Sequence, residues 1–164
     1  MKGELESEGG TPRFFADSML GKLATWLRVL GCDVEYEREI GDFELEQRAR
    51  REGRIILTRD TLLIRRRGVR DRFFLVESDR WAEQLRQVAE NFNLSGRRLL
   101  TRCLRCNAEL EPVEKAAVEG LVPPYVFGTQ ESFSRCPLCL RVYWAGTHRD
   151  RMEKELSGIL KGLS

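Results

Sequence analysis

Two C-x-x-C pairs constrain this chain more than any other feature of its sequence. The first pair is Cys103 and Cys106, and the second, after a gap of 29 residues, is Cys136 and Cys139. Thiolates bind zinc tetrahedrally, and each C-x-x-C turn brings two sulfur atoms to one ion, so two turns complete a closed site. The long gap costs little, because loop-closure entropy rises only logarithmically with length. We predict that the four cysteines hold one structural Zn²⁺ in a zinc ribbon.

Other uses of these thiols fit the sequence less well. Five cysteines are an odd number, and four of them form C-x-x-C pairs, which favours metal binding over a disulfide framework. A redox motif is expected once, at the start of a helix, and only the pair Cys136 and Cys139 would satisfy that on its own. The fifth, Cys32, lies in a stretch typical of a buried, unreactive thiol.

The chain ahead of these pairs alternates strand-like and helix-like patterns. Short apolar stretches predict strands at 13–16, 33–36, 54–58 and 73–76, and apolar residues at helical spacing predict helices at 19–30, 43–52, 61–66 and 81–92. In the second helix we expect Phe43, Leu45 and Ala49 to face the core. The alternation predicts an α/β fold with a parallel sheet flanked by helices on both faces.

The length of 164 residues leaves room for one α/β domain of about 100 residues and a small appended module. Turn-forming residues at 93–96 mark the expected boundary between the two. We therefore expect a flexible tail at 1–12, an α/β domain at 13–95, a zinc ribbon at 96–148 and a C-terminal helix at 149–164. The apolar stripe of that helix predicts that it docks on the ribbon or, failing that, on a second copy; it comprises Met152, Leu156, Ile159 and Leu160.

The composition indicates no membrane segment. Charged residues make up 33% of the chain, the mean hydropathy is −0.42, and no apolar run approaches the roughly 20 residues that a membrane helix needs. The stretch 1–12 has the pattern of neither a secretory signal nor a transit peptide. We expect a cytoplasmic protein with no membrane partner.

Four aspartates stand at or just beyond the ends of the predicted strands: Asp17, Asp42, Asp60 and Asp79. The carboxyl ends of parallel strands meet at one edge of a sheet, where sites form at the topological switch point. Carboxylates gathered there repel one another unless a cation neutralises them, and Mg²⁺ or Mn²⁺ prefers such oxygen ligands. Because these ions polarise phosphodiesters and activate water, the pattern predicts metal-dependent phosphodiester hydrolysis.

Each aspartate also has a purely structural interpretation. Asp is a favoured helix N-cap, and every one of the four precedes a predicted helix. The sequence also leaves open whether Glu44, Glu46 or Glu77 takes the place of Asp42 or Asp79 in the acidic site.

Arginine accounts for 23 of the 28 basic residues, although the net charge is only +2. Arginine suits bidentate phosphate contacts, but its excess equally fits a compositional or thermal bias, and charge runs are often only solvated faces. Our candidates for contact with a phosphate backbone are Arg59, Arg65, Arg66, Arg67 and Arg105. Such contacts predict weak sequence preference and marked salt sensitivity.

Several motifs together resemble a known family, the Mut-seven C-terminal RNases, which join a PIN-like nuclease domain to a zinc ribbon. The matching motifs lie at 15–24, 26–31, 56–60, 102–107 and 142–148. The resemblance runs from about Arg13 to Met152. It implies a PIN-like fold and a metal-dependent endoribonuclease acting on RNA, and it carries over Asp17 and Asp60 most directly, with Asp42 and Asp79 as the further acids.

The chain departs from this family pattern at two positions. Leu140 follows Cys139 where the family usually has Gly, which puts the left-handed turn there in question. Thr25 stands where a basic residue is common. His148 belongs to the family's Gly-Thr-His motif, and because the zinc shell is already full we expect it to make a structural hydrogen bond.

A competing hypothesis is a binding module without catalysis, an RNA- or ribosome-associated adaptor that uses the same fold and ribbon. Acids kept only as helix caps would bind no divalent ion, so metal binding separates the two hypotheses. A toxin-like partner of an inhibitor protein rests on fold analogy alone.

Overall fold

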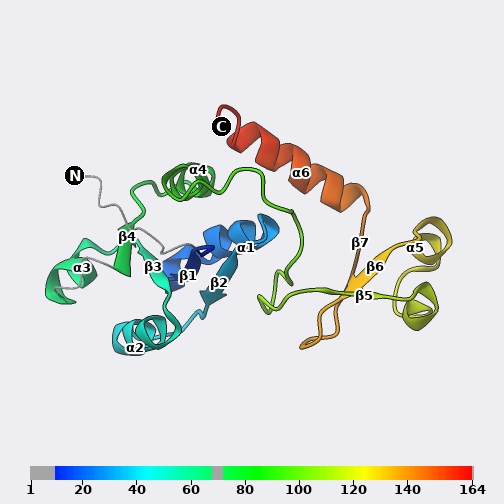
Figure 1. Cartoon of the computed structure of the whole chain (residues 1–164), viewed down its shortest axis with the longest axis horizontal. Helices are drawn as coiled ribbons and strands as arrows, with labels where there is room; N and C mark the ends of the chain where they lie inside the picture. The colour runs from blue at the N-terminus through cyan, green and yellow to red at the C-terminus, as the bar shows by residue number, and fades with distance from the viewer. Residues whose placement is uncertain (1–9, 68–71, 164) are drawn as a thin grey trace.

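The computed structural model describes residues 10–67 and 72–163, without the side chains of residues 66 and 67. Its first sheet has four strands in the order β2-β1-β3-β4, and every neighbouring pair is parallel (Figure 1). The strands are β1 (Arg13–Ala16), β2 (Asp33–Tyr36), β3 (Ile55–Thr58) and β4 (Phe73–Leu75). The predicted parallel sheet is therefore confirmed.

Helices cover both faces of this sheet, as the alternation predicted. They are the 3₁₀ turn η1 (Ser18–Leu20), α1 (Gly21–Val29), α2 (Asp42–Glu52), α3 (Thr61–Arg67) and α4 (Trp81–Asn91). Leu27 of α1 and Leu85 of α4 share one buried cluster with Phe14. On the other face, Leu45 of α2 and Leu63 of α3 pack in a second cluster.

The inward face of α2 differs from the expectation at one residue. Leu45 and Ala49 are buried, but Phe43 is 61% exposed. Because consecutive residues are about 100° apart on a helix, Phe43 lies about 200° from Leu45, on the opposite side. The prediction that Leu45 and Ala49 face the core is confirmed, and the same prediction for Phe43 was wrong.

A second, smaller sheet follows, with three antiparallel strands in the order β5-β6-β7 (Figure 1). Its elements are β5 (Glu111–Val113), the 3₁₀ turn η3 (Lys115–Val118), α5 (Pro124–Thr129), β6 (Phe133–Arg135) and β7 (Val142–Trp144). Its small core consists of Val118, Val122 and Phe133. We call the part of the chain from 102 to 146 the ribbon.

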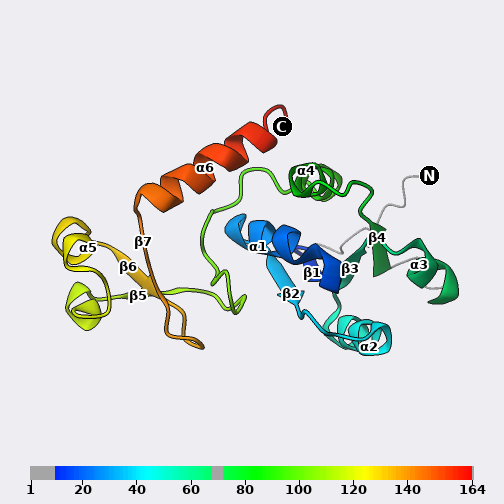
Figure 2. The ribbon, with the colours of Figure 1, turned by 180° about the vertical axis from the view of Figure 1, so that it is seen from behind.

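The C-terminal helix α6 (Thr147–Ile159) does not dock on the ribbon, so that expectation was wrong. It runs back from the ribbon to α4, as both ribbon views show (Figure 2). Leu156 is 2% exposed and belongs to the core of the parallel sheet. Arg86 of α4 donates hydrogen bonds to the carbonyls of Ile159 and Lys161 at 2.9 and 3.0 Å. The apolar stripe thus packs on the core that α1 and α4 share with the parallel sheet, and the end of the chain is hydrogen-bonded to α4.

The predicted tail at 1–12 lies mostly outside the described residues, and the domain boundaries remain predictions. Among the helices that the structure describes, none combines the length and apolar character needed to cross a membrane. The cytoplasmic location also remains a prediction.

Candidate functional site

The four predicted cysteine ligands come together in space. Their sulfur atoms all lie within 4.8 Å of one another, and the Sγ atoms of Cys103 and Cys139 are 3.7 Å apart. A tetrahedral zinc site with Zn–S bonds of about 2.3 Å has sulfur–sulfur edges of about 3.8 Å. The group therefore fits Zn²⁺ in both its ligand type and its size.

The two C-x-x-C turns have the same backbone geometry. In the first, the N–H of Asn107 donates to the carbonyl of Cys103 at 2.9 Å, and the N–H of Cys106 points to the Cys103 sulfur at 3.4 Å. In the second, the N–H of Leu140 donates to the carbonyl of Cys136 at 3.0 Å. Backbone N–H groups aimed at sulfur stabilise thiolates, which is the form that binds a metal.

The electrostatics of this group favour a bound cation. Burial raises the pKa of the Cys103 thiol, but hydrogen bonds from the Tyr143 hydroxyl and from backbone N–H groups outweigh it and lower the pKa to about 6. Burial and the sulfur atoms of Cys139 and Cys103 raise the pKa of Cys106. The thiols therefore cannot all be charged together unless a cation offsets their repulsion.

The left-handed turn that the Leu140 substitution put in question is present. Leu140 has φ 64°, and Asn107, at the equivalent position of the first turn, has φ 65°. Leucine pays a steric penalty in this conformation that glycine avoids. The ribbon tolerates that strain, and the ligand geometry is unchanged by it.

We predict that Leu140→Gly raises the free energy of unfolding of the zinc-loaded protein by about 1 kcal/mol, because it relieves this strain. The side chain is 55% exposed, so its removal sacrifices little packing. Urea unfolding measures the effect. The exposed Leu138, which has no positive φ, is the matched control, and Leu138→Gly should give no gain. Equal behaviour of the two variants would contradict the strain argument.

The first C-x-x-C turn is also joined to the parallel sheet, through the edge strand β2. Asn107 accepts a hydrogen bond from the N–H of Val34 at 2.9 Å and donates to Asp33 at 2.7 Å. Arg28 of α1, only 5% exposed, donates to the carbonyl of Val34 at 2.9 Å and to that of Leu104 at 2.9 Å. Both backbone groups of Val34 at this edge are thereby paired, which protects the edge and couples the ribbon to the sheet.

Asp17 and Asp60 meet at the second candidate site, at the carboxyl ends of β1 and β3. These two strands are neighbours, and their connections leave in opposite directions along the sheet, which defines a switch point. Thr58, the last residue of β3, donates from Oγ1 to Asp17 Oδ2 at 2.8 Å. The same Oγ1 accepts the N–H of Asp60 at 3.0 Å. Thr58 thus bonds to the carboxylate of Asp17 and to the backbone of Asp60.

Asp17 is a buried carboxylate that no basic residue neutralises. It is 8% exposed, and its Oδ1 accepts from the N–H and the hydroxyl of Ser18 at 2.6 and 3.2 Å. Within the described residues no Lys or Arg forms an ion pair with it. A buried charge without a partner is costly, so this carboxylate suits a cation ligand.

Asp60 combines the two roles that the sequence left open. Its Oδ1 accepts the N–H groups of Leu62 and Leu63 at 2.8 and 3.2 Å, which is the N-cap of α3. Its other oxygen, Oδ2, makes no hydrogen bond within the described part of the chain. The capping interpretation is therefore confirmed for Asp60 and, at the 3₁₀ turn η1, for Asp17, whose side chain accepts the N–H of Ser18.

The structure does not bring Asp42 and Asp79 to this pair. Both are exposed, Asp42 as the first residue of α2 and Asp79 two residues before α4. Neither caps its helix, since the N-caps are Gly41 and Arg80. Among the described residues, no group of three or more acids comes as close together as the four cysteines do. The site therefore shows two carboxylates, and roles for Asp42 and Asp79 stay predictions.

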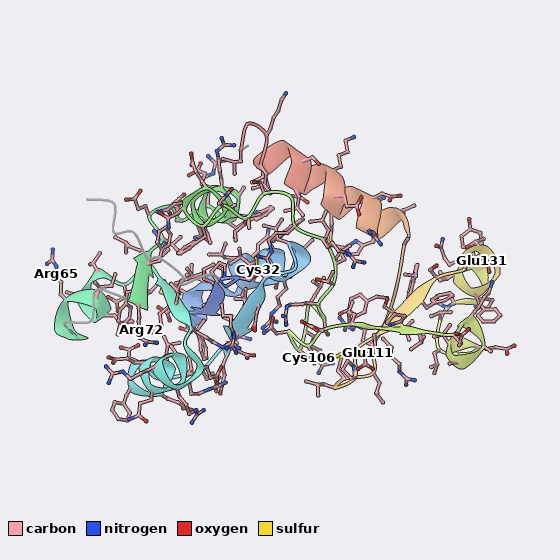
Figure 3. The ribbon with its side chains drawn as sticks, in the orientation of Figure 1. Cys32, Arg65, Arg72, Cys106, Glu111 and Glu131 are labelled. Carbon is pink, nitrogen blue, oxygen red and sulfur yellow. The ribbon has the colours of Figure 1, made fainter. Side chains whose placement is uncertain are left out.

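The predicted phosphate-binding arginines do not form one patch. Arg65 is exposed on α3, at the end of the molecule away from the ribbon (Figure 3), whereas Arg105 is exposed on the ribbon. Arg59 lies directly beside Asp60, and its buried Nε makes no hydrogen bond within the described residues. The side chains of Arg66 and Arg67 are outside the description.

A groove on the ribbon, of about 620 Å³, brings together arginines that flank the C-x-x-C pairs in the sequence and adds an aromatic residue to them. Arg105 lines it with Arg135, Arg141 and Trp144. His148, in contrast, is exposed and makes no hydrogen bond to the described residues, so the structural bond expected of it is absent there.

A family model described as the Mut7-C RNAse domain matches residues 12–156, which is most of the chain. No curated protein and no solved structure gives a significant match.

Proposed function

The chain belongs to the Mut7-C RNAse domain family, and from that membership we propose that it is a ribonuclease that hydrolyses RNA internally with Mg²⁺ or Mn²⁺ held at Asp17 and Asp60. The observation that supports this site most strongly is the buried carboxylate of Asp17, which no basic side chain among the described residues neutralises and whose partner Thr58 also accepts the backbone N–H of Asp60. The four cysteines hold a structural Zn²⁺ in this proposal.

Two carboxylates are a sufficient protein contribution for such an ion. Mg²⁺ usually keeps several waters and is bound through one or two carboxylates together with substrate phosphates. When bound, such an ion polarises the phosphodiester and lowers the pKa of water. In this proposal the exposed Asp42 and Asp79 act from the rim, through water.

The chain's own residues fix and complete this site. Thr58 and Ser18 hold the Asp17 carboxylate by hydrogen bonds to both of its oxygens. The N-cap bonds of Asp60 fix one of its oxygens, and the other accepts no hydrogen bond from the described residues. Arg59 is half-buried and its Nε makes no hydrogen bond to the described residues, so in this proposal the guanidinium is free to turn toward a phosphate oxygen next to these acids.

The ribbon groove supports a contribution of the zinc module to RNA binding. Arginines pair with the backbone, and an aromatic ring such as that of Trp144 stacks on a base, so the groove suits single-stranded RNA. Arg65 lies at the end of the molecule away from the ribbon (Figure 3), whereas the backbone of Arg105 contacts Arg28 of α1, so contacts at both would require a strand that spans the parallel-sheet unit.

Cleavage of labelled single-stranded and hairpin RNA by the zinc-loaded protein tests the proposal. We expect internal cleavage with Mn²⁺ or Mg²⁺, weak sequence preference and no cleavage without a divalent ion. A chelator is unsuitable as the metal-free condition because it would also remove zinc; dialysed buffer is the control. Cleavage independent of divalent ions would refute metal dependence.

One observation favours the alternative, a non-catalytic RNA-binding adaptor. Only two of the four aspartates come together, and Asp60 does cap a helix. The adaptor binds RNA but leaves it intact under every metal condition above.

Thr58 provides a further test, because it is fully buried and contacts both acids. We expect Thr58→Val, which keeps the shape but removes the hydroxyl, to lower kcat about 10- to 100-fold, as loss of a bond that orients a metal ligand typically does. Thr58→Ser retains the hydroxyl and should keep most activity. Steady-state kinetics, with zinc content as a check of folding, measures both. Equal loss in the two variants would point to packing and not to the hydroxyl.

A further inference from the structure

Five arginines converge on a cavity that the proposed cleavage site does not use. The cavity measures about 880 Å³ and lies where the parallel sheet, the connecting segment at 97–102, the ribbon and α6 meet. The arginines are Arg13, Arg97, Arg98, Arg102 and Arg149, against two acidic residues, Asp33 and Glu109. They come from three separate stretches of the chain, so the fold and not a local charge run creates this concentration.

Part of this arginine set holds the structure together. Arg97 donates to the carbonyl of Gly31 at 3.2 Å, and Arg102 donates to that of Asn107 at 2.8 Å. Arg13 pairs with Asp33 at 3.2 Å. Each guanidinium has five N–H donors, so these bonds leave further donors unused.

Two arginines of the cavity make few interactions with the described residues. Arg98 is exposed, and its side chain makes no hydrogen bond or ion pair to the described residues. The side chain of Arg149 is 41% exposed and, among the described residues, pairs only with Glu153, one turn along the same helix, at 2.8 Å. Such an exposed pair on one helix is worth little and is readily exchanged for a stronger anion.

The cavity lies at the amino ends of the parallel strands, and the two acids lie at their carboxyl ends. Arg13 begins β1, and Asp17 follows its last residue, so about 13 Å of strand separates the two ends. Asp33, the first residue of β2, and Gly31 just before it also line the cavity, so the cavity lies at the amino ends of both strands.

We propose that this cavity is a second RNA site, which holds phosphates of a single strand away from the bond that is cut. The inference rests on the proposed ribonuclease function. The volume suits a group of nucleotide size, and the surplus of unpaired arginine donors suits phosphate oxygens. Because of the separation, only an RNA that extends beyond the cleavage site reaches the cavity.

Fluorescence anisotropy of RNA binding tests this second site. The zinc-loaded full chain carries Asp17→Asn so that the RNA stays intact, and labelled single strands of about four and about sixteen nucleotides are compared. The measured quantity is the salt slope, the fall in log K of binding per unit of log salt concentration. Each phosphate contact of a single strand contributes about 0.7 to it, so Arg98→Gln/Arg149→Gln should lower the slope by about 1.4 for the long RNA. Its affinity for the long RNA should fall about tenfold near 0.1 M salt, and that for the short RNA should not change.

A matched pair controls for net charge. Arg50→Gln/Lys154→Gln removes the same charge from exposed residues that do not line the cavity, and it should leave the slope nearly unchanged. Melting temperature and zinc content verify that both pairs fold. If both pairs change the slope equally, the cavity is not a site. If the wild type cleaves RNA with Mn²⁺ but the cavity pair binds RNA like its control pair, this inference fails and the proposed function stands. If the Asp17→Asn protein without either pair binds no RNA, both fail.

Discussion

We expect Cys103→Ser to release the zinc and unfold the ribbon, a loss on the order of 10 kcal/mol of metal-binding free energy. Among the described residues, three apolar side chains of the ribbon core are buried, Val118, Val122 and Phe133, with partly buried ones around them, and a module of this size needs a metal or another cross-link to fold. Without the metal, the 29 residues between the two C-x-x-C pairs are closed into a loop mainly by the short pairing of β5 with β6.

The same variant should also weaken the parallel sheet. Asn107 reaches the edge strand only because the first C-x-x-C turn fixes its backbone, and it holds the N–H of Val34. Zinc content, near-ultraviolet circular dichroism and amide exchange at Val34 measure the two effects. Cys32→Ala is the control, because Cys32 is buried outside the zinc group and its pKa is raised to about 11, mainly by burial. Full zinc occupancy in Cys103→Ser would contradict the assignment.

The second large effect is expected at Asp17. We predict that Asp17→Asn lowers kcat about 10³-fold, because the several kcal/mol that a bound cation contributes to the transition state depend on this charge. Asparagine keeps the size of the side chain, its oxygen can still accept the N–H of Ser18, and its NH₂ group can donate to the Thr58 hydroxyl in place of the bond that Asp17 Oδ2 accepts. The fold should therefore persist, and steady-state RNA cleavage measures the loss.

Asp60→Asn separates catalysis from helix capping. Asparagine is as good an N-cap as aspartate, so α3 should remain stable while activity falls. Asp42→Asn, at an exposed acid outside the pair, is the matched control and should have the smaller effect. Full activity in Asp17→Asn and Asp60→Asn would leave both residues with structural roles only.

The sequence predicted the strands of the parallel sheet well because each is a short apolar run with a turn on either side. β1 and β2 begin and end as predicted, and β3 and β4 differ by one residue at one end. The stripe on α6 indicated that the helix is packed, but a stripe does not tell which apolar surface it meets. Only the tertiary structure shows that Leu156 belongs to the core beside α4.

The candidate sites were predicted only where local sequence spacing determines the positions of the side chains. Spacing alone groups cysteines that form tight turns, so the four clustered cysteines follow directly from sequence. Acids after strands depend on the loops that carry them: Asp17 directly follows β1, whereas Asp42 lies beyond a loop and stays exposed. Thr58 and Asn107 were missed because one has the pattern of a buried strand residue and the other that of a turn, and their side-chain bonds are long-range.

Calorimetric titration of Mn²⁺ into the zinc-loaded protein tests the central claim most directly, that Asp17 and Asp60 hold a catalytic cation. The account predicts Mn²⁺ binding by the wild type that Asp17→Asn abolishes, with the zinc content unchanged in both. Absence of Mn²⁺ binding in the wild type and in the presence of RNA, or equal binding by Asp17→Asn, would contradict it and favour the adaptor.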